Sequence, residues 1–407
     1  MVRRRRPLVS ALKSVLVVLS ALVVAVAAYA WVNFSDLERG TSTSDLRAAP
    51  PDGATDILLV GMDSRTDAQG HPLPPEVLSQ LRAGENEANM TDTLILVHVP
   101  NNGQPPVAFS MPRDAFVSIP GHGQHKINSA FGRGKSEAVE ALKQQGVTDP
   151  AEIDRRASEA GRQLMLATVA QLTGVGIDHY AEVNLLGFDQ LTKAVGGVPV
   201  CLKDQVHDSY SGANFKPGPQ KVSGTDALAF VRQRHGLPRG DLDRVVRQQA
   251  FLAGLSRTMT STGVLTSPST LSGLIQSVKQ SIVLDKGWDV LGFASRMQGV
   301  AGGSTKFSTI PIQRENESTP DGSAVEVDPA QVQRAVHSEI STAAGPEPPR
   351  FGPKPVVRLD GKQARTPSQS GSQGGSQGGS QGDQDSGSSS DAPQQPTITA
   401  NGVPCVN

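Results

Sequence analysis

The chain has few cysteines, almost no net charge and only one long apolar run. The two cysteines allow at most one disulfide within its 407 residues. Its 38 Lys and Arg residues are balanced by 39 Asp and Glu residues, for a formal net charge of −1. This balance argues against binding along nucleic acids, so any anion site must be local. The length permits one large domain with accessory segments.

The long apolar run lies near the N-terminus. Arginines at 3–6 precede the apolar segment 8–32, and its part from 15 to 32 has no charged side chain. As a helix this part is about 27 Å long, close to the thickness of a bilayer core. We therefore predict a cytoplasmic basic segment (1–7), a single transmembrane anchor (8–32) and an exported remainder. The alternative is a cleaved signal peptide ending near Ala28-Tyr29-Ala30.

The stretch 228–249, LAFVRQRHGLPRGDLDRVVRQQ, is the most cationic one outside the N-terminus. Arginine presents a planar fork of donors that stays charged, so several arginines that converge suit a phosphate or pyrophosphate. The alternative is a solvated helix face. The arginines concerned are Arg232, Arg234, Arg244 and Arg247.

Helix boundaries decide whether these arginines converge. Glycine and proline at 236–240 are expected to end a first helix, and Asp241 is expected to cap a second one. Asp241, Arg244 and Gln248 then share one face of the second helix.

Charged residues border three apolar runs that read as buried strands, at 55–60, 93–99 and 107–110. Such borders are candidate sites because ligands favour the ends of buried strands. Two or three carboxylates beside a pyrophosphate-binding arginine cluster indicate Mg²⁺, with Mn²⁺ as an alternative. Taken singly, each Asp is also explained as a turn or capping residue. The bordering residues are Asp63, Arg65, Asp92, Arg113 and Asp114.

Strands and helices alternate along the rest of the chain, which predicts an α/β fold. We expect a three-layer αβα domain with a central mixed, mostly buried sheet over 54–341. A linker at 33–53 precedes it, and a Gly/Ser/Gln/Pro-rich disordered tail at 342–407 follows. His122, His125 and Lys126 are expected in a loop near the binding site of an acceptor substrate rather than at a metal site. Further helices are expected at 154–172, 184–195, 271–282, 288–297 and 329–340, and strands at 180–183, 198–202 and 306–312.

Several segments together resemble the LytR-CpsA-Psr family of cell-envelope phosphotransferases. They are DILLVGMDSR, TDTLILVHVP, AFSMPRDAFVSIPG with HKINSAFGRG, AEVNLLGFDQLTKAVGGVPV and AFVRQRHGLPRGDLDRVVRQQ, spread over 56–249. The resemblance implies an enzyme that takes a glycopolymer from a polyprenyl-pyrophosphate carrier. It attaches the polymer to peptidoglycan, usually at the 6-hydroxyl of N-acetylmuramic acid, and releases the lipid monophosphate.

The resemblance also implies roles for single residues. Asp63 and Asp92 are the Mg²⁺-associated carboxylates, and Asp114 and Asp241 orient arginines or assist. The pyrophosphate clamp consists of Arg65, Arg113, Arg232, Arg234, Arg244 and Gln248. Catalysis is assigned to Asp63, Asp92, Arg113, Asp114 and Arg244.

The chain departs from the family pattern at two positions. Met90 stands where many members have an arginine, so one clamp contact is lost or supplied by another side chain. Pro219 stands where many actinobacterial members have a cysteine that pairs with the one at 201. Cys201 is therefore free or bonded to Cys405, and an oxidising compartment favours the bond.

Two other functions compete with the transferase. A lipid-pyrophosphate phosphatase would use water in place of the sugar hydroxyl. A non-enzymatic wall-binding or regulatory protein would need no reaction, although the balanced charge and exported topology argue against regulation through DNA. We also expect an apolar tunnel for the prenyl chain, with the helical stretch 164–169 beside it.

Overall fold

The computed structural model describes residues 42–44, 53–83, 90–260, 281–289, 293, 305–344, 398–399 and 404–407. The predicted basic segment and anchor, most of the linker and most of the tail lie outside these residues. So do most of the predicted helices 271–282 and 288–297. None of the helices in the described ranges is both long and apolar enough to span a membrane.

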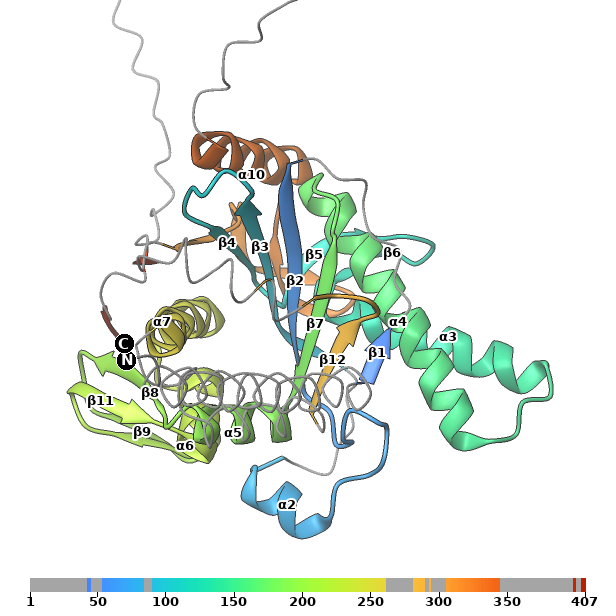
Figure 1. Cartoon of the computed structure of the whole chain (residues 1–407), viewed down its shortest axis with the longest axis horizontal. Helices are drawn as coiled ribbons and strands as arrows, with labels where there is room; N and C mark the ends of the chain where they lie inside the picture. Colours follow the sequence, from blue (N-terminus) through green and yellow to red (C-terminus); the bar gives the residue numbers. More distant parts are fainter. Residues whose placement is uncertain are drawn as a thin grey trace, which may run out of the picture. The chain divides into compact units, whose positions relative to one another are not determined.

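An eight-stranded mixed sheet forms the centre of the domain, with strand order β1-β12-β7-β2-β3-β4-β13-β16 (Figure 1). β2, β3 and β4 are antiparallel neighbours, whereas β7 runs parallel to β2 and β13 parallel to β4. The bounds are β1 Ser42–Ser44, β2 Ala54–Met62, β3 Thr91–Pro100, β4 Val107–Met111, β7 His179–Asn184, β12 Ile282–Asp285, β13 Lys306–Thr309 and β16 Ile398–Thr399.

Helices cover both faces of this sheet because its strands are apolar on both sides. Leu94 and Leu96 belong to one buried cluster and Ile95 to another, as alternation along a strand requires. The first cluster is completed by α4 and α10, the second by α6 and α7. The helices are α2 Pro75–Gln80, α3 Ala130–Gln144, α4 Pro150–Thr173, α5 Leu185–Ala194, α6 Gly224–Arg232, α7 Asp241–Thr260 and α10 Pro329–Ala344, with the 3-10 turn η1 Ile127–Ser129.

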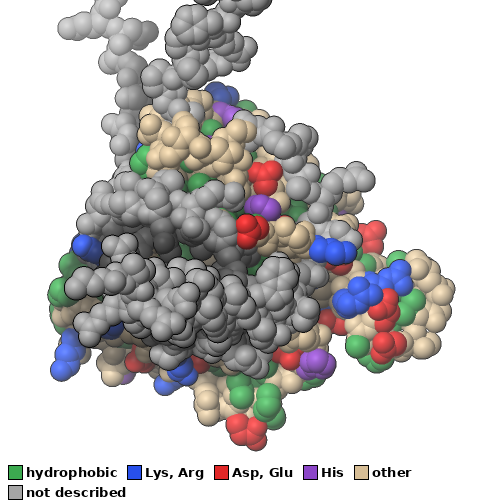
Figure 2. Space-filling view, in the orientation of Figure 1, with side chains coloured by type: hydrophobic (Ala, Val, Ile, Leu, Met, Phe, Trp, Pro, Cys, Tyr) green, Lys and Arg blue, Asp and Glu red, His purple; other side chains and the backbone are tan. Residues whose placement is uncertain are grey.

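Local signals fix where the longest helix begins and ends. The carboxylate of Asp149 accepts hydrogen bonds from the backbone amides of Ala151 and Glu152 at the start of α4. Gly174 ends the helix in the left-handed conformation, with φ 72°. Positively and negatively charged side chains are mixed on the surface at the end of the molecule formed by α3 and α4 (Figure 2). One ion pair there joins Arg155 to Glu152 at 2.6 Å. Such exposed pairs add little stability.

Three smaller sheets flank the centre. A four-stranded sheet has the order β14-β15-β5-β6, a three-stranded one β11-β8-β17, and a hairpin joins β9 and β10. Their bounds are β5 Ala115–Ile119, β6 Gly123–Lys126, β8 Val198–Leu202, β9 Val206–Asp208, β10 Ala213–Phe215, β11 Gly218–Val222, β14 Arg314–Thr319, β15 Gly322–Glu326 and β17 Cys405–Val406.

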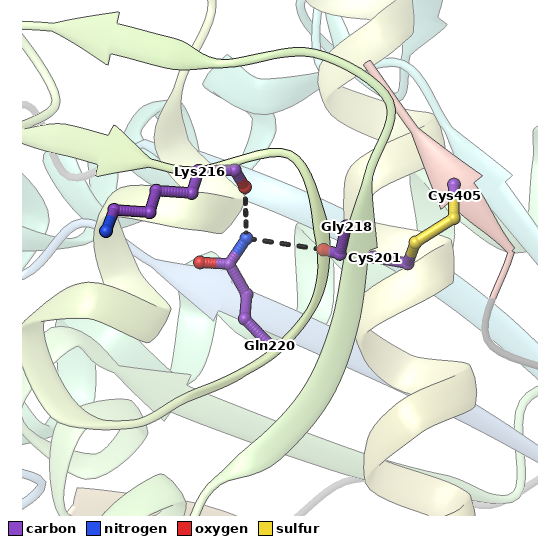
Figure 3. Close-up of a disulfide and its surroundings, with 5 residues drawn as sticks. All are labelled: Cys201, Lys216, Gly218, Gln220 and Cys405. Carbon is purple, nitrogen blue, oxygen red and sulfur yellow. Dashed lines mark hydrogen bonds between the residues drawn. A yellow bond between two sulfur atoms is a disulfide. The ribbon is translucent and has the colours of Figure 1, made fainter.

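A disulfide joins Cys201 to Cys405 across neighbouring strands (Figure 3). The two residues are directly opposite in the parallel pairing of β8 with β17, and their Cα atoms are 4.3 Å apart. The prediction of a disordered tail over 342–407 is therefore wrong at its far end, where β16 and β17 add to the sheets. Composition could not reveal this, because strand addition depends on partners far away in the chain.

Some predicted elements also differ from the structure. The segment holding His122 and His125 is the β5–β6 hairpin rather than an open loop. The strand predicted at 306–312 ends at Thr309, and Ile282, predicted to be helical, begins strand β12. Short apolar runs do not distinguish a strand from a buried helix.

Candidate functional site

The ends of three central strands bring the predicted site residues to one edge of the sheet. β2 ends at Met62, which is opposite Thr91 at the start of β3. β4 ends at Met111, which is opposite Leu94 of β3. Because neighbouring strands run in opposite directions, the end of β2, the start of β3 and the end of β4 meet there.

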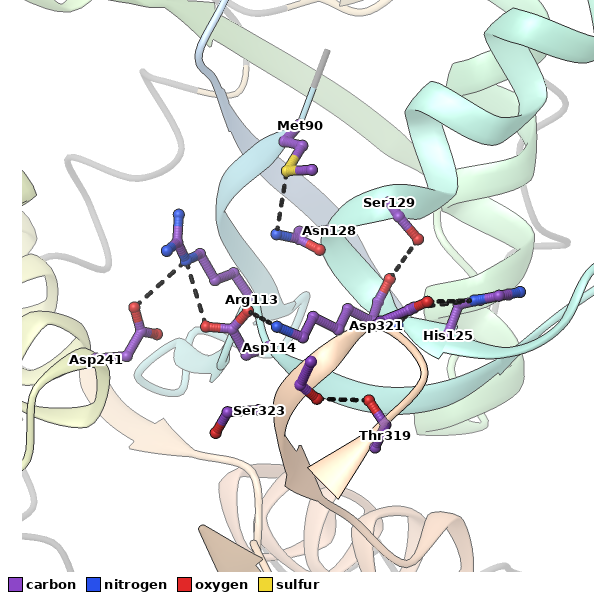
Figure 4. Close-up of polar contacts among 12 residues, drawn as sticks. Met90, Arg113, Asp114, His125, Asn128, Ser129, Asp241, Thr319, Asp321 and Ser323 are labelled. Carbon is purple, nitrogen blue, oxygen red and sulfur yellow. Dashed lines mark hydrogen bonds and ion pairs between the residues drawn. The ribbon is translucent and has the colours of Figure 1, made fainter. Parts of the chain in front are cut away.

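Arg113 lies at the centre of an ionic cluster at this edge. Its Nη1 donates to Asp92 Oδ1 at 2.7 Å. Its Nε lies 3.5 Å from Asp114 Oδ2 and 3.4 Å from Asp241 Oδ1 (Figure 4). On the far side of Asp114, Lys126 Nζ approaches Oδ1 at 3.1 Å. We call Asp92, Arg113, Asp114, Asp241 and Arg244 the clamp cluster.

Arg244 enters the clamp cluster from the first turn of α7. Its Nη2 lies 2.9 Å from Asp241 Oδ1 and donates to the carbonyl oxygen of Asp92 at 3.3 Å. The carboxylate of Asp241 is thus shared between Arg244 and Arg113. It does not cap α7 as predicted: Asp241 is the first helical residue, and Asp243 instead accepts the backbone amide of Arg239 at 2.9 Å.

Some buried polar atoms of the clamp cluster have no hydrogen-bond partner within it. Arg113 Nε, Arg244 Nε and both carboxylate oxygens of Asp241 are buried without a hydrogen bond in the described part of the chain. The contacts of Asp241 with the arginines are therefore ion contacts without hydrogen-bond geometry. Buried polar atoms are nearly always hydrogen-bonded, and unused guanidinium donors are what a bound anion requires.

Burial and charge shift the pKa values within the clamp cluster in opposite directions. Burial alone raises the pKa of Asp92, but Arg113 and Arg244 outweigh it and hold that pKa below its usual value. For Asp241 burial prevails over Arg244 and Arg113, so its pKa is raised. Burial also prevails for Arg244, where it disfavours the cation and lowers the pKa. For Arg113, the charges of Asp92, Asp241 and Asp114 outweigh burial and raise the pKa.

Asp63 and Arg65 form a second ion pair at the same edge, through Arg65 Nη1 and Asp63 Oδ1. The backbone amide of Asp63 donates to the carbonyl oxygen of Met90 at 3.3 Å, which ties the end of β2 to the segment before β3. Met90 itself is 40% exposed, and its sulfur accepts from Asn128 Nδ2 at 3.7 Å (Figure 4).

The remaining predicted clamp residues lie around this edge in different settings. Arg232 Nη1 donates to the carbonyl oxygen of Leu81 at 3.2 Å, and Arg232 is near enough to help lower the pKa of Asp92 after burial and the other arginines. Arg234 is exposed in the loop that follows α6. Gln248 Nε2 donates to the carbonyl oxygen of Val231 at 3.4 Å and so links α7 to α6.

Arg247 lies outside the clamp cluster, although it belongs to the same cationic stretch. It is fully buried, its guanidinium lies 5.1 Å from the ring centre of Phe230, and its Nε donates to the carbonyl oxygen of Asn407. Burial lowers its pKa to about 10.

Asp63 and Asp92 fit Mg²⁺ only as part of a larger ligand set. The described residues hold no group of three metal-ligating side chains. Mg²⁺ bound with a phosphorylated ligand needs only one or two carboxylates, because phosphate oxygens and water complete its octahedron. Both aspartates also pair with an arginine, an arrangement that suits an ion arriving with its phosphate rather than one held by protein alone.

Lys126 and its neighbours are site residues that the sequence did not assign to the clamp. His125 Nδ1 lies 2.9 Å from Asp321 Oδ2, which also accepts the backbone amide of Lys126 at 3.1 Å. His122 Nε2 lies 3.2 Å from Glu137. The segment HKINSAFGRG was the available signal, but its partner Asp321 is almost two hundred residues away in the chain.

Of two cavities lined by described residues, the smaller one adjoins the clamp cluster. The larger, of about 300 Å³, is lined by Arg162 and Glu182, whose Nε and Oε2 are 2.8 Å apart. Its lining includes no clamp-cluster residue. The stretch 164–169 does not line it either, since Met165 and Val169 fill the core. The apolar prenyl tunnel therefore stays a prediction.

The chain is similar in sequence to known cell-envelope proteins. The model of the LytR-CpsA-Psr family matches residues 24–339, more than half of the chain. The cell wall biosynthesis protein LcpA of Corynebacterium glutamicum is 47% identical over 314 residues, which are 77% of this chain and 60% of LcpA. This chain thus matches less than two thirds of the length of that relative.

More distant relatives extend the comparison. The polyisoprenyl-teichoic acid–peptidoglycan teichoic acid transferase TagU of Oceanobacillus iheyensis is 28% identical over 266 residues, or 65% of this chain and 68% of TagU. The crystal structure of B. subtilis TagV has 20% identity and a TM-score of 0.52, covering 74% of this chain and all of TagV, and supports the fold. By the match over 24–339, the chain belongs to the LytR-CpsA-Psr family.

Proposed function

We propose that the protein is a Mg²⁺-dependent phosphotransferase that moves a glycopolymer from a polyprenyl-pyrophosphate carrier to peptidoglycan. The observation that carries this proposal is that the arginines Arg113 and Arg244 both contact Asp241, and that each has a buried Nε without a hydrogen bond among the described residues. Two such forks match the oxygens of a pyrophosphate. The similarity to LcpA and TagU, whose names refer to cell wall biosynthesis and teichoic acid transfer, supports the same proposal.

The proposed reaction exchanges one P–O bond for another. The 6-hydroxyl of N-acetylmuramic acid attacks the phosphorus next to the glycopolymer, and a new P–O bond to that hydroxyl oxygen forms. The bond from this phosphorus to the bridging oxygen breaks, and polyprenyl phosphate leaves with the bonding electron pair. Arg113 and Arg244 stabilise the negative charge that develops on the leaving phosphate.

Mg²⁺ held by Asp63, Asp92 and the phosphates would add positive charge at the same place.

The hydroxyl proton needs a carboxylate to receive it. Asp92 is a weak base because Arg113 and Arg244, acting against burial, hold its pKa low. Both oxygens of Asp241 are buried. Asp63, a further candidate, is paired with Arg65 and would hold the metal. We therefore assign the proton to Asp114, whose side chain is 21% exposed and lines the cavity beside the clamp cluster.

The proposed setting follows from the expected membrane anchor at 8–32. An anchored, exported domain meets a lipid-linked donor at the membrane and its acceptor, peptidoglycan, in the wall. No nucleic-acid partner is part of this proposal.

A transfer assay tests the proposal. The full chain is incubated with a radiolabelled polyprenyl-pyrophosphate oligosaccharide and peptidoglycan oligomers, with Mg²⁺ or with EDTA. We expect label on the peptidoglycan only with Mg²⁺. Release of labelled oligosaccharide phosphate without transfer would show a phosphatase instead, and no reaction at all would favour a wall-binding or regulatory protein.

A further inference from the structure

A polar cavity of about 260 Å³ adjoins the clamp cluster on the side of the β14–β15 hairpin. Asp114 and Asp241 form its wall toward the clamp cluster, and Glu315, Asn316 and Ser323 belong to the hairpin wall. Figure 4 shows Ser323 on the side of Asp114 and Asp241 that faces the hairpin. We call this space the hairpin cavity.

The hairpin wall has an irregular backbone at the cavity. The pairing of β14 with β15 shifts register between Arg314 and Glu317, so the cavity-lining residues Glu315 and Asn316 form a bulge. Asn316 adopts φ 60°, in the left-handed region that Asn tolerates better than most residues. Ser323 Oγ lies 3.3 Å from Asn316 Oδ1. Bulges near sites re-aim side chains, and here the bulge supplies two polar groups to the cavity.

The position of this wall relative to Asp114 is fixed by backbone contacts. The amide of Val325 donates to the carbonyl oxygen of Asp114 at 2.8 Å, and β15 pairs in parallel with β5 from there on. At the tip of the hairpin, Asp321 accepts the backbone amide of Lys126. The hairpin is therefore held to the segment that carries Asp114 at both of its ends.

The lining chemistry selects a neutral, hydroxyl-rich ligand. Carboxylates, an amide and a hydroxyl offer both donors and acceptors, as polyols require. The lining also includes Arg239, which is paired with Asp243 at 2.6 Å. A second phosphate does not fit, because Asp114, Asp241 and Glu315 would repel it. We propose that the hairpin cavity binds a sugar ring. The sugar is that of the acceptor glycan, because Asp114 belongs to both the hairpin cavity and the clamp cluster and a hydroxyl there adjoins the phosphorus.

This inference rests on the proposed function, and the sugar has two sources, the acceptor glycan or the first sugar of the donor. The test therefore measures KM for peptidoglycan oligomers and KM for the lipid-linked donor separately. Ser323→Phe fills the cavity with a side chain from the exposed hairpin. Thr319→Phe is the matched control, since Thr319 lies on the same hairpin, points to the face opposite to that of Ser318 and Ser323 by strand alternation, and does not line the cavity.

We expect Ser323→Phe to raise the acceptor KM at least tenfold, with the donor KM and the melting temperature close to those of Thr319→Phe. Asn316→Gly, which removes the amide at a position whose φ of 60° glycine adopts freely, should raise the acceptor KM by a smaller factor. A rise in the donor KM alone would overturn the acceptor assignment and place the donor sugar there. Unchanged KM values for both substrates in a folded Ser323→Phe protein would overturn sugar binding altogether.

A binding measurement separates this inference from the proposed function. Saturation-transfer NMR with N-acetylglucosaminyl–N-acetylmuramic acid requires no turnover. Signal with the wild-type chain and with Thr319→Phe, but not with Ser323→Phe, supports the hairpin cavity even if transfer fails. Equal signal from all three chains contradicts it.

Discussion

Arg244 and Arg247 are one turn apart on α7, and both are buried, yet their surroundings differ completely. Arg244 lies against the carboxylate of Asp241 at 2.9 Å, at the edge where the central strands end. Arg247 lies against the ring of Phe230 and the carbonyl oxygen of Asn407, where the three-stranded sheet packs on α7. Both arginines keep buried donors without a hydrogen bond among the described residues, Nε of Arg244 and Nη1 and Nη2 of Arg247. Their neighbours therefore decide: carboxylates at the strand ends make the first an anion-binding group, whereas an aromatic ring and a backbone oxygen make the second a structural one.

The largest effect is expected when Arg244 is replaced. Arg244→Ala should lower the transfer rate by about 100-fold or more, the usual loss for one preorganised donor to a developing charge. Arg244→Lys keeps the charge but loses the fork, so it should recover only part of the rate. Transfer assays at matched folded concentration measure both. Activity within threefold of wild type in Arg244→Ala would remove this residue from the clamp.

Arg247→Ala should affect stability rather than transfer. Truncating this fully buried side chain leaves a cavity beside Phe230, at a cost of about 3 kcal/mol in the free energy of unfolding. Urea unfolding measures that loss, and the transfer rate per folded molecule should fall far less than in Arg244→Ala. An equal loss of transfer in a well-folded Arg247→Ala protein would end the distinction between the two arginines.

The disulfide sharpens the structural side of the comparison. Cys405→Ser should lower the free energy of unfolding by about 2–4 kcal/mol, the usual loss for a disulfide, here one that closes a loop of 204 residues. Combined with Arg247→Ala, the losses should be less than additive, since both residues hold the segment that ends in β17. Fully additive losses would show that Arg247 and the disulfide act independently.

The smallest effect concerns the partner of Arg244. The pKa of Asp241 is raised by burial above its ordinary 3.8, so the folded state is penalised when this group is ionised. Asp241→Asn should therefore raise the melting temperature at pH 7, and the gain should disappear as the pH falls below about 4, where the wild-type group is protonated in both states.

Asp92 gives the opposite sign and serves as the matched control. Its pKa is lowered, with Arg113 and Arg244 outweighing burial, so its stabilising contribution is present above its ordinary 3.8 and is lost as the pH falls through the lower folded value. Asp92→Asn should destabilise the protein at pH 7. Melting curves from pH 3 to 8 check both variants, and shifts of the same sign at pH 7 would contradict the assignment.

The sequence predicted the parts of the site that depend on local patterns. Buried strands with charged ends placed Asp92, Arg113 and Asp114 at one edge, and the second helix of the cationic stretch carried Asp241 and Arg244 there. Local patterns could not separate Arg244 from Arg247, because the difference lies in what packs against each one. Phe230 precedes them in the chain, and Asn407 follows 160 residues later.

Long-range pairing also hid the rest of the surroundings. The segment that precedes the end of the tail has a composition typical of disorder. The end itself nevertheless forms β17, which pairs with β8 and places Cys405 opposite Cys201. The hairpin cavity forms only because β15 pairs with β5, and this pairing joins residues about two hundred positions apart in the chain. Sequence patterns describe what a segment prefers, and these contacts depend on which segment it meets.

Binding of farnesyl pyrophosphate tests the central claim most directly, because it requires neither an acceptor nor the polymer. Isothermal titration calorimetry with Mg²⁺ would compare the wild-type chain, Arg244→Ala and Arg247→Ala, with farnesyl monophosphate as the control ligand. We predict that the wild-type chain prefers the pyrophosphate, that Arg244→Ala weakens its binding at least tenfold, and that folded Arg247→Ala binds it as the wild type does. Equal affinity for both ligands, or equal losses in the two variants, would contradict a pyrophosphate clamp at this edge of the sheet.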